Sequence, residues 1–130
     1  MKLLDSNILI YAADPAQGGL RERILAEPAG VSVATMVEVL GYHLLTVEEE
    51  SDLRQMLDEL VIFPTDIAVA ERAIALRQER KMGLADAIIA ATALVHGLTL
   101  VTRNVDDFKH VAGLELINPF AEPETDGSAG

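Results

Sequence analysis

The sequence contains no cysteine, and only five of its 130 residues are aromatic. Without cysteine the protein can form neither a disulfide, nor a thiolate metal site, nor a catalytic thiol, and a cytoplasmic location is favoured. Half of the residues are hydrophobic and about a quarter are charged. This balance excludes a disordered chain and a disulfide-stapled mini-protein, and the length predicts one domain with its own core.

Long apolar runs are also missing. The apolar run Ala87–Val95 has nine residues, whereas a membrane-spanning helix needs roughly 20. At the N-terminus a carboxylate, Asp5, follows too soon for a secretory signal peptide. The sequence therefore predicts a cytoplasmic protein that does not enter a membrane.

Positive charge is scarce, with 10 basic residues against 21 acidic ones and a net charge of −11. This balance argues against a protein that grips nucleic acid through a broad basic face. Only residues 72–110 carry more basic than acidic side chains, and we expect an anionic partner to contact this segment. Its basic residues are Arg72, Arg77, Arg80, Lys81, Arg103 and Lys109.

Short apolar strands alternate with helical segments along the chain, which predicts an α/β fold: three α/β/α layers around a mostly parallel sheet. The domain is expected over residues 1–120, and the Pro-, Glu-, Gly- and Ser-rich residues 121–130 are expected to be a disordered tail. We expect strands at 2–4, 30–33, 60–63, 98–102 and 114–117. We expect the helices at about 8–13, 20–26, 35–45, 47–59, 66–81 and 84–95, with a short turn at 106–110.

Local signals fix several of these elements. Capping boxes are indicated where Thr35 precedes Glu38 and where Thr46 precedes Glu49. The apolar run at residues 60–63, ended by proline, predicts a strand buried on both faces.

Acidic residues follow the predicted strands or begin the predicted helices. Asp5 ends the first strand, and ligands of open α/β sheets bind beyond the carboxyl ends of the strands. Glu38 and Asp86 are each followed by non-charged residues three, four and seven positions on, which places both carboxylates on the core-facing stripe in the first turn of a helix.

Each acid alone has a structural explanation. Asp5 could form an Asx-turn, Glu38 could complete a capping box with Thr35, and Asp86 could complement a helix N-terminus. Together, three inward carboxylates would repel one another without a cation, and oxygen-only ligands select Mg²⁺ or Mn²⁺. The three histidines do not stand at metal-ligand spacing, and the sequence has no glycine-rich phosphate loop and no nucleophile elbow.

Four segments resemble the acidic-site motifs of PIN domains, in particular those of VapC-type ribonuclease toxins of bacterial toxin–antitoxin pairs. They are LLDSNILIY around Asp5, SVATMVEV around Glu38, GLADAIIAATA around Asp86, and LVTRNVDDF around Asn104 and Asp107. The resemblance runs from Met1 to about Phe120, where INPF resembles the usual ending of the family.

The resemblance implies hydrolysis of an RNA phosphodiester at a Mg²⁺ site in which Mn²⁺ can substitute. It implies Asp5 and Asp86 as direct metal ligands and Glu38 as the holder of a metal-bound water or as a base. Asn104 stands where some family members have aspartate, and other members use the acid before the phenylalanine, here Asp107, so either residue could assist at a second position. Thr102 resembles the small hydroxyl residue near the site.

The resemblance also implies an RNA substrate, a VapB-type antitoxin partner and a homodimer. The apolar segments 20–25 and 37–45 are compatible with such protein contacts. Because aromatic residues are scarce and only Tyr11 lies near the motifs, we expect the RNA backbone to be contacted by basic side chains. The candidates are Arg77, Arg80, Lys81 and Arg103.

Two other hypotheses about the function are open. A phosphotransfer or phosphatase protein could use Asp5, but such phosphatases need a second aspartate at the position of Asn7, and receivers need an acidic pair that is absent. A catalytically silent binding module with the same fold is the other reading, and the presence of all three acids argues against it.

Overall fold

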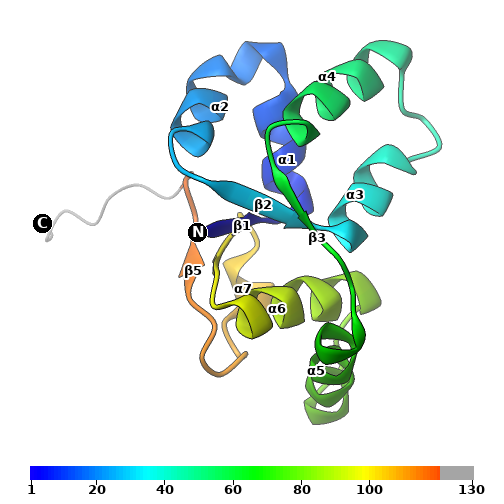
Figure 1. The fold of residues 1–130 in the computed structure, drawn as a ribbon, viewed down its shortest axis with the longest axis vertical. Coiled ribbons are helices and arrows are strands. Elements are labelled where there is room, and N and C mark those ends of the chain that lie inside the picture. The colour runs from blue at the N-terminus through cyan, green and yellow to red at the C-terminus, as the bar shows by residue number, and fades with distance from the viewer. Residues whose placement is uncertain (121–130) are drawn as a thin grey trace, which may run out of the picture.

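A five-stranded sheet in the order β3-β2-β1-β4-β5 forms the middle layer of the computed structural model, which describes residues 1–120 (Figure 1). All four strand pairs are parallel. The predicted three-layer α/β fold is therefore confirmed. The strands are β1 (Lys2–Leu4), β2 (Ala29–Ser32), β3 (Val61–Phe63), β4 (Thr99–Val101) and β5 (Leu116–Ile117).

Helices cover both faces of the sheet (Figure 1). On one side lie α1 (Ser6–Ala13), α2 (Gly18–Leu25), α3 (Val33–Leu40) and α4 (Val47–Leu57), with a short 3₁₀ turn at Pro15–Gln17. On the other side lie α5 (Ile67–Glu79), α6 (Leu84–His96) and α7 (Val105–Phe108).

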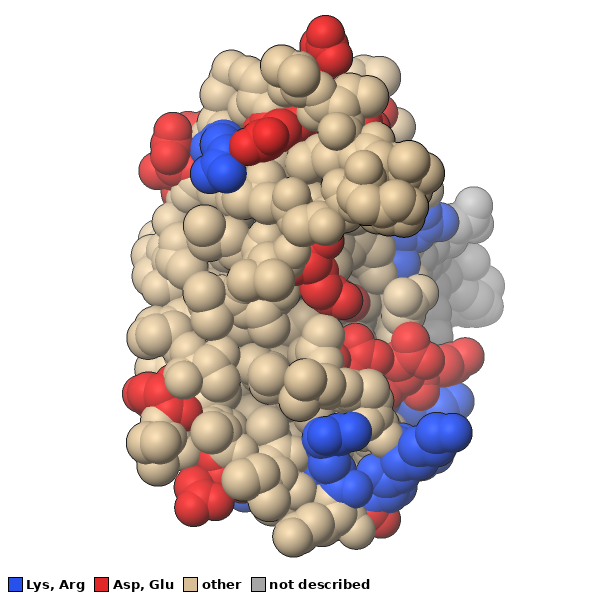
Figure 2. Space-filling model, turned by 90° about the vertical axis from the view of Figure 1, so that its right-hand side faces the viewer, with Lys and Arg blue, Asp and Glu red and all other residues tan. Residues whose placement is uncertain are grey.

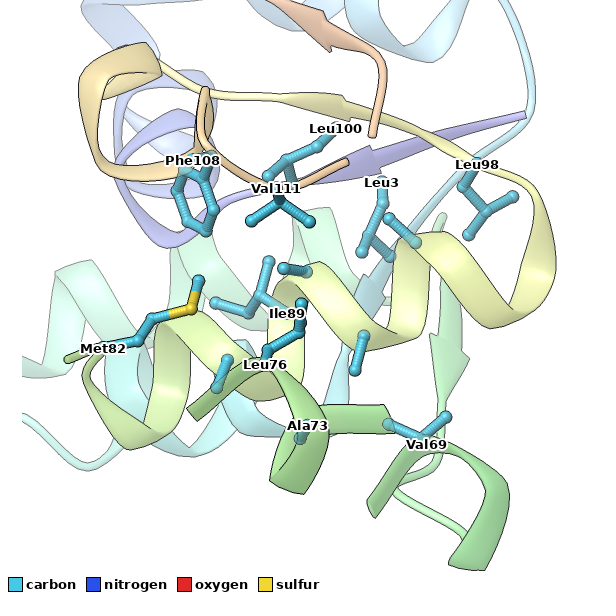
Figure 3. Close-up of a cluster of buried hydrophobic side chains, with 14 residues drawn as sticks. Leu3, Val69, Ala73, Leu76, Met82, Ile89, Leu98, Leu100, Phe108 and Val111 are labelled. Carbon is cyan, nitrogen blue, oxygen red and sulfur yellow. The ribbon is translucent and has the colours of Figure 1, made fainter. Parts of the chain in front are cut away.

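The two faces carry separate cores because successive strand residues point to opposite sides of a sheet. Leu3 and Leu100 pack against α5, α6 and α7, as Figure 3 shows. Leu4 and Val101, the next residues along, belong to the core on the other face. A strand with apolar residues on both faces has no clean alternation, which explains the continuous apolar runs of the sequence.

The start of α3 differs from the prediction. The helix begins at Val33, where the Ser32 hydroxyl accepts a hydrogen bond from the Ala34 backbone N–H at 3.1 Å, so the expected capping box of Thr35 and Glu38 is wrong. Thr35 is instead buried, and its hydroxyl has no partner within residues 1–120. Ser32 ends β2 directly before the helix, so strand and helix join without a loop.

Other predicted signals are confirmed. Thr46 and Glu49 form a reciprocal capping box at α4, Asp66 caps α5, and α6 ends at Gly97 in the left-handed conformation with φ +66°. The expected helix over 35–45 ends early, at Leu40.

The strand at residues 60–63 is not buried on both faces, as predicted, but lies at the edge of the sheet. The side chains of Val61 and Ile62 are 46% and 37% exposed, since β3 pairs only with β2. The apolar run therefore predicted the strand correctly but not its place in the sheet.

Within residues 1–120, no helix has both the length and the hydropathy to cross a bilayer. The predicted disordered tail at 121–130 lies outside the described residues.

Candidate active site

Asp5 lies at the carboxyl edge of the sheet, directly after β1, and its side chain is only 5% exposed. It caps α1 by accepting a hydrogen bond from the Ser6 backbone N–H at 2.8 Å. Its second oxygen, Oδ2, accepts from the Thr102 hydroxyl at 2.7 Å and from the Asn7 amide at 3.4 Å. Three neighbours thus fix the orientation of this buried carboxylate.

Thr102 follows β4, next to β1 in the sheet, and is fully buried. Its hydroxyl oxygen accepts a hydrogen bond from the Asn104 backbone N–H at 3.0 Å. Because that N–H occupies one lone pair, the single hydroxyl proton is free to point at Asp5. Thr102 therefore links the ends of the two central strands.

Asp86 lies in the first turn of α6, as predicted, and is half-buried. Burial, followed by the negative charges of Asp5, Asp107 and Glu38, raises the pKa of Asp86 from its ordinary value of 3.8 to about 6. These charges act on Asp86 because the four carboxylates lie in one region, although they come from four different elements.

Glu38 lies elsewhere on its helix than expected. The prediction that it faces the core in a first turn is wrong: Glu38 is the sixth residue of α3 and its side chain is exposed. It accepts a hydrogen bond from the Ser6 hydroxyl through Oε1, which ties α3 to the start of α1. Because α3 begins at Val33, Glu38 lies in its second turn and its side chain is accessible to solvent.

Of the two acids in the fourth motif, Asp107 is the one that acts on the other acids: its negative charge raises the pKa of both Asp5 and Asp86. Asp106 forms an ion pair with Lys109 at 3.1 Å. The Asn104 side chain is exposed and makes no hydrogen bond within residues 1–120. Its backbone N–H donates to the Thr102 hydroxyl, and its carbonyl accepts from the Asp107 N–H.

The four acids of this region have no basic partner in the described residues. Within residues 1–120, no Lys, Arg or His side chain forms an ion pair with Asp5, Glu38, Asp86 or Asp107. Burial raises the pKa of Asp5, hydrogen bonds from Thr102 and Ser6 oppose the rise, and the charges of Glu38 and Asp107 add to it. Asp5 and Asp86 are therefore both harder to ionise than ordinary aspartates. A cation bound nearby would lower both pKa values again.

The carboxylates lie in one region but are not gathered around one point: in the described part of the chain, no three Asp, Glu or His side chains are close enough to enclose an ion. Mg²⁺ does not need three direct protein ligands, since it keeps several waters and takes one or two carboxylates. Carboxylate oxygens that have no basic partner therefore fit a hard divalent ion. Figure 2 shows acidic side chains in the hollow at the middle of one face, with basic side chains directly below them.

Comparison with known proteins decides the family. The model of the PIN domain matches residues 2–114, which is most of the chain. The chain belongs to the PIN-domain family. The resemblance expected from the four motifs is thereby confirmed.

The relatives of this PIN domain are VapC proteins. It is 30% identical to Ribonuclease VapC10 of Mycobacterium tuberculosis, over 95% of this chain and 96% of that protein. Ribonuclease VapC1 of Rickettsia felis is 49% identical over 41 residues, which span 32% of this chain and 31% of that protein. The chain is therefore a member of the VapC branch of the PIN domains, the toxin ribonucleases of toxin–antitoxin pairs.

Solved structures resemble this PIN domain over nearly its whole length. A toxin–antitoxin complex from Klebsiella pneumoniae superposes with a TM-score of 0.73 at 35% identity, covering 94% of this chain and 100% of that one. VapBC2 from Rickettsia felis, bound to a promoter DNA fragment, superposes with a TM-score of 0.77 at 24% identity, covering 90% and 97%. The second likeness supports the fold alone.

Two residues that support the acids of this PIN domain were not predicted. Ser6 binds Glu38, and Asn7 links two segments by donating to Asp5 and accepting from the Arg103 backbone N–H at 3.3 Å. In the sequence both residues are ordinary turn and cap formers beside Asp5. No local pattern indicates that their partners lie 32 and 96 residues away.

Replacing Thr102 with valine is expected to lower the free energy of unfolding by about 1–3 kcal/mol. Valine has the shape of threonine but lacks the hydroxyl that donates to the buried Asp5 carboxylate. The Thr102→Ser variant keeps the hydroxyl and should stay close to the wild type. Urea denaturation of the metal-free proteins compares them. Equal stability of the valine and serine variants would contradict the role assigned to the hydroxyl.

Proposed function

We propose that this PIN domain is a Mg²⁺-dependent endoribonuclease, the toxin of a type II toxin–antitoxin pair, and that it hydrolyses RNA phosphodiester bonds at the acidic edge of its sheet. The observation that carries the proposal is a set of four carboxylates, one directly after β1 and the others on α3, α6 and α7, none of which has an ion-pair partner within residues 1–120. The charges of Glu38 and Asp107 raise the pKa of both Asp5 and Asp86. Full-length similarity to Ribonuclease VapC10 supports the same activity.

Within this proposal, Asp5 and Asp86 would bind Mg²⁺ directly. When bound there, the ion supplies Lewis-acid polarisation of the scissile phosphate and lowers the pKa of a water. Thr102 and the Ser6 backbone N–H hold Asp5 in one orientation, which spares the site the cost of ordering that ligand.

Glu38 would accept the proton of the attacking water or orient that water. Its exposed position suits this role better than a buried one, since a base must reach a water that enters from solvent. The Ser6 hydroxyl fixes one of its oxygens and so limits where the carboxylate can swing.

The fourth position can be assigned by metal titration. Asp107→Ala is expected to weaken Mn²⁺ binding about tenfold, because the negative charge of Asp107 acts on the proposed ligand Asp86. Asn104→Asp is expected to strengthen Mn²⁺ binding, because it adds a charged oxygen ligand. Asp106→Asn is the matched control, since Asp106 pairs with Lys109. Calorimetry measures the affinities, and identical isotherms for all four proteins would exclude both positions from the site.

RNA is compatible with this acidic protein for two reasons. A bound divalent ion would offset part of the charge at the site, and basic side chains border the acids on the same face (Figure 2). All four basic residues expected to contact RNA, Arg77, Arg80, Lys81 and Arg103, are exposed. Arg77 has a structural role as well, because its Nε donates to the Met82 carbonyl at 3.1 Å and so holds the connection from α5 to α6.

A VapB-type antitoxin would be the protein partner. A groove of about 410 Å³ between α1, α3 and α4 has apolar walls that include Ile10, Val39 and Leu53. Every charged residue that lines it is acidic, namely Asp14, Glu38, Glu49 and Asp52. An antitoxin segment with apolar side chains and a basic one would match this groove, and Glu38 belongs to both the groove and the candidate active site.

The homodimer and the cytoplasmic location belong to the same proposal. Val37 and Leu44 are 67% and 64% exposed near α3, and a second copy would cover such apolar surface. In the cytoplasm the protein would encounter both an RNA substrate and an antitoxin. Molecular mass from light scattering is expected to show a dimer.

Incubation with labelled RNA tests the activity. Wild-type protein is expected to cut RNA in Mg²⁺, to stop when EDTA is added, and to resume when Mn²⁺ or excess Mg²⁺ is returned. Cleavage that persists in EDTA would contradict the metal site, and intact RNA in Mg²⁺ would contradict the nuclease. The phosphotransfer alternative predicts release of phosphate from acyl phosphates instead.

A further inference from the structure

The guanidinium of Arg103 rests on two aromatic rings at the margin of the acidic site. Its central carbon is 4.7 Å from the centroid of the Tyr11 ring and 4.5 Å from that of the Phe120 ring. The two rings lie 5.2 Å apart and are tilted by 58°. Three distant segments therefore build this stack: α1, the residues after β4, and the end of the described chain.

The stack is connected to the candidate active site through Asn7. The Arg103 backbone N–H donates to Asn7 Oδ1, and the Asn7 amide donates to Asp5. Tyr11 follows Asn7 by four residues on α1, so the two side chains lie on one face of the helix, one turn or ~5.4 Å apart. The residue that carries the ring under the guanidinium thus lies about one helical turn along α1 from the residue that contacts Asp5.

The N–H groups of the Arg103 guanidinium have no partner in the described residues. The side chain is exposed, and within residues 1–120 its guanidinium forms neither an ion pair nor a hydrogen bond. Both ring centroids lie within 4.7 Å of the guanidinium carbon, so the rings contact the group without accepting hydrogen bonds from its N–H groups. A cation–π contact of this kind holds the group in place without using its hydrogen-bond donors.

We propose that Arg103 binds a phosphate of the RNA strand next to the one that is cut, and that Tyr11 and Phe120 hold its guanidinium in position for this contact. The inference rests on the proposed ribonuclease function. A planar guanidinium whose N–H groups have no partner within residues 1–120 can donate to two phosphate oxygens at once. Successive phosphates of one strand are joined by six covalent bonds, a span comparable with one helical turn.

A phosphate is the better match than a base. Each ring already has a face covered by the guanidinium, so the stack offers bases less stacking surface than two free aromatic rings would. A backbone phosphate also needs no particular nucleotide, so this contact would position the strand without selecting its sequence.

Steady-state cleavage of a labelled single-stranded RNA in Mg²⁺ tests the proposal. Arg103→Met is expected to raise KM about tenfold, with kcat changed by less than about twofold, because the contact is equally present before and during the reaction. The slope of log KM against log salt concentration should fall by about 0.7, as one phosphate contact is lost. Arg23→Met on α2 is the matched control and should retain the wild-type KM and slope.

Two further variants separate binding from a purely structural role. Tyr11→Leu should raise KM by a smaller factor and leave the salt slope unchanged, because the cation stays but loses its support. Arg103→Lys keeps the charge without the planar fork, and it should raise KM about threefold at an unchanged slope even if Arg103→Met fails to fold.

The outcomes are distinguishable. Wild-type KM and salt slope in both Arg103→Met and Arg103→Lys, with a lowered melting temperature, would show that Arg103 only holds the segment around Phe120 against α1. That result would overturn this inference and leave the ribonuclease function intact. Failure of the wild-type protein to cut any RNA would overturn the proposed function, and this inference with it.

Discussion

Asp5→Asn is expected to lower the rate of RNA cleavage on the order of 10³-fold or more while the fold remains intact. Asparagine keeps one oxygen, which can accept from the Ser6 backbone N–H and so retain the cap of α1. Its NH₂ group replaces the oxygen that accepts from Thr102, and it can donate to the Thr102 hydroxyl oxygen instead. Asparagine lacks the negative charge that a hard cation requires. Single-turnover cleavage in saturating Mg²⁺ measures the loss, and circular dichroism verifies the fold.

The Asp106→Asn variant is the matched control for Asp5→Asn. It removes one carboxylate from the same side of the molecule, but from a side chain that is paired with Lys109. This control should cut RNA at the wild-type rate. Wild-type cleavage by a folded, metal-saturated Asp5→Asn protein would show that the site assignment is wrong.

Asp86→Asn is expected to stabilise the metal-free protein at pH 7.5, raising its melting temperature by about 4 °C. The pKa of Asp86 is about 6 in the folded protein against an ordinary value of 3.8. Ionised Asp86 therefore opposes folding above pH 6, by ~1 kcal/mol once solvent screening of this half-buried group is allowed for. A large loss of stability would support the view that Asp86 only complements the helix N-terminus.

The effect of Asp86→Asn should depend on pH in a defined direction. As pH falls from about 7 to about 4, the folded wild type takes up a proton that the unfolded chain does not yet bind, so its stability rises toward that of the variant. Thermal unfolding in EDTA across this range should therefore show the difference shrinking toward zero. In saturating Mg²⁺ at pH 7.5 the order should reverse, because only the wild type gains from binding the ion.

The sequence was informative where one local signal decided the structure. Asp5 after the first apolar strand and Asp86 in the first turn of α6 lie where predicted, because strand ends and helix starts are encoded by their neighbours. The capping box at Thr46 and the glycine at position 97 have the same local character. The parallel sheet followed from apolar runs that alternate with helices.

The sequence was misleading where two local signals competed. Ser32 and Thr35 can both cap a helix, and the wrong choice placed Glu38 in a first turn facing the core. The exposed edge position of β3 depends on strand order, which an apolar run does not encode. The contacts of Ser6 with Glu38 and of Asn7 with the Arg103 backbone are set by tertiary packing, so no short pattern indicates them.

An anomalous difference map from crystals soaked in Mn²⁺ tests most directly whether the acids at the sheet edge hold a divalent cation. The account predicts a peak at ~2.1 Å from a carboxylate oxygen of Asp5 and of Asp86, with Glu38 and Asp107 turned toward it. The same soak of Asp5→Asn crystals should show no peak there. A map of the wild type without a peak at this edge, or with its peak elsewhere, would contradict the account.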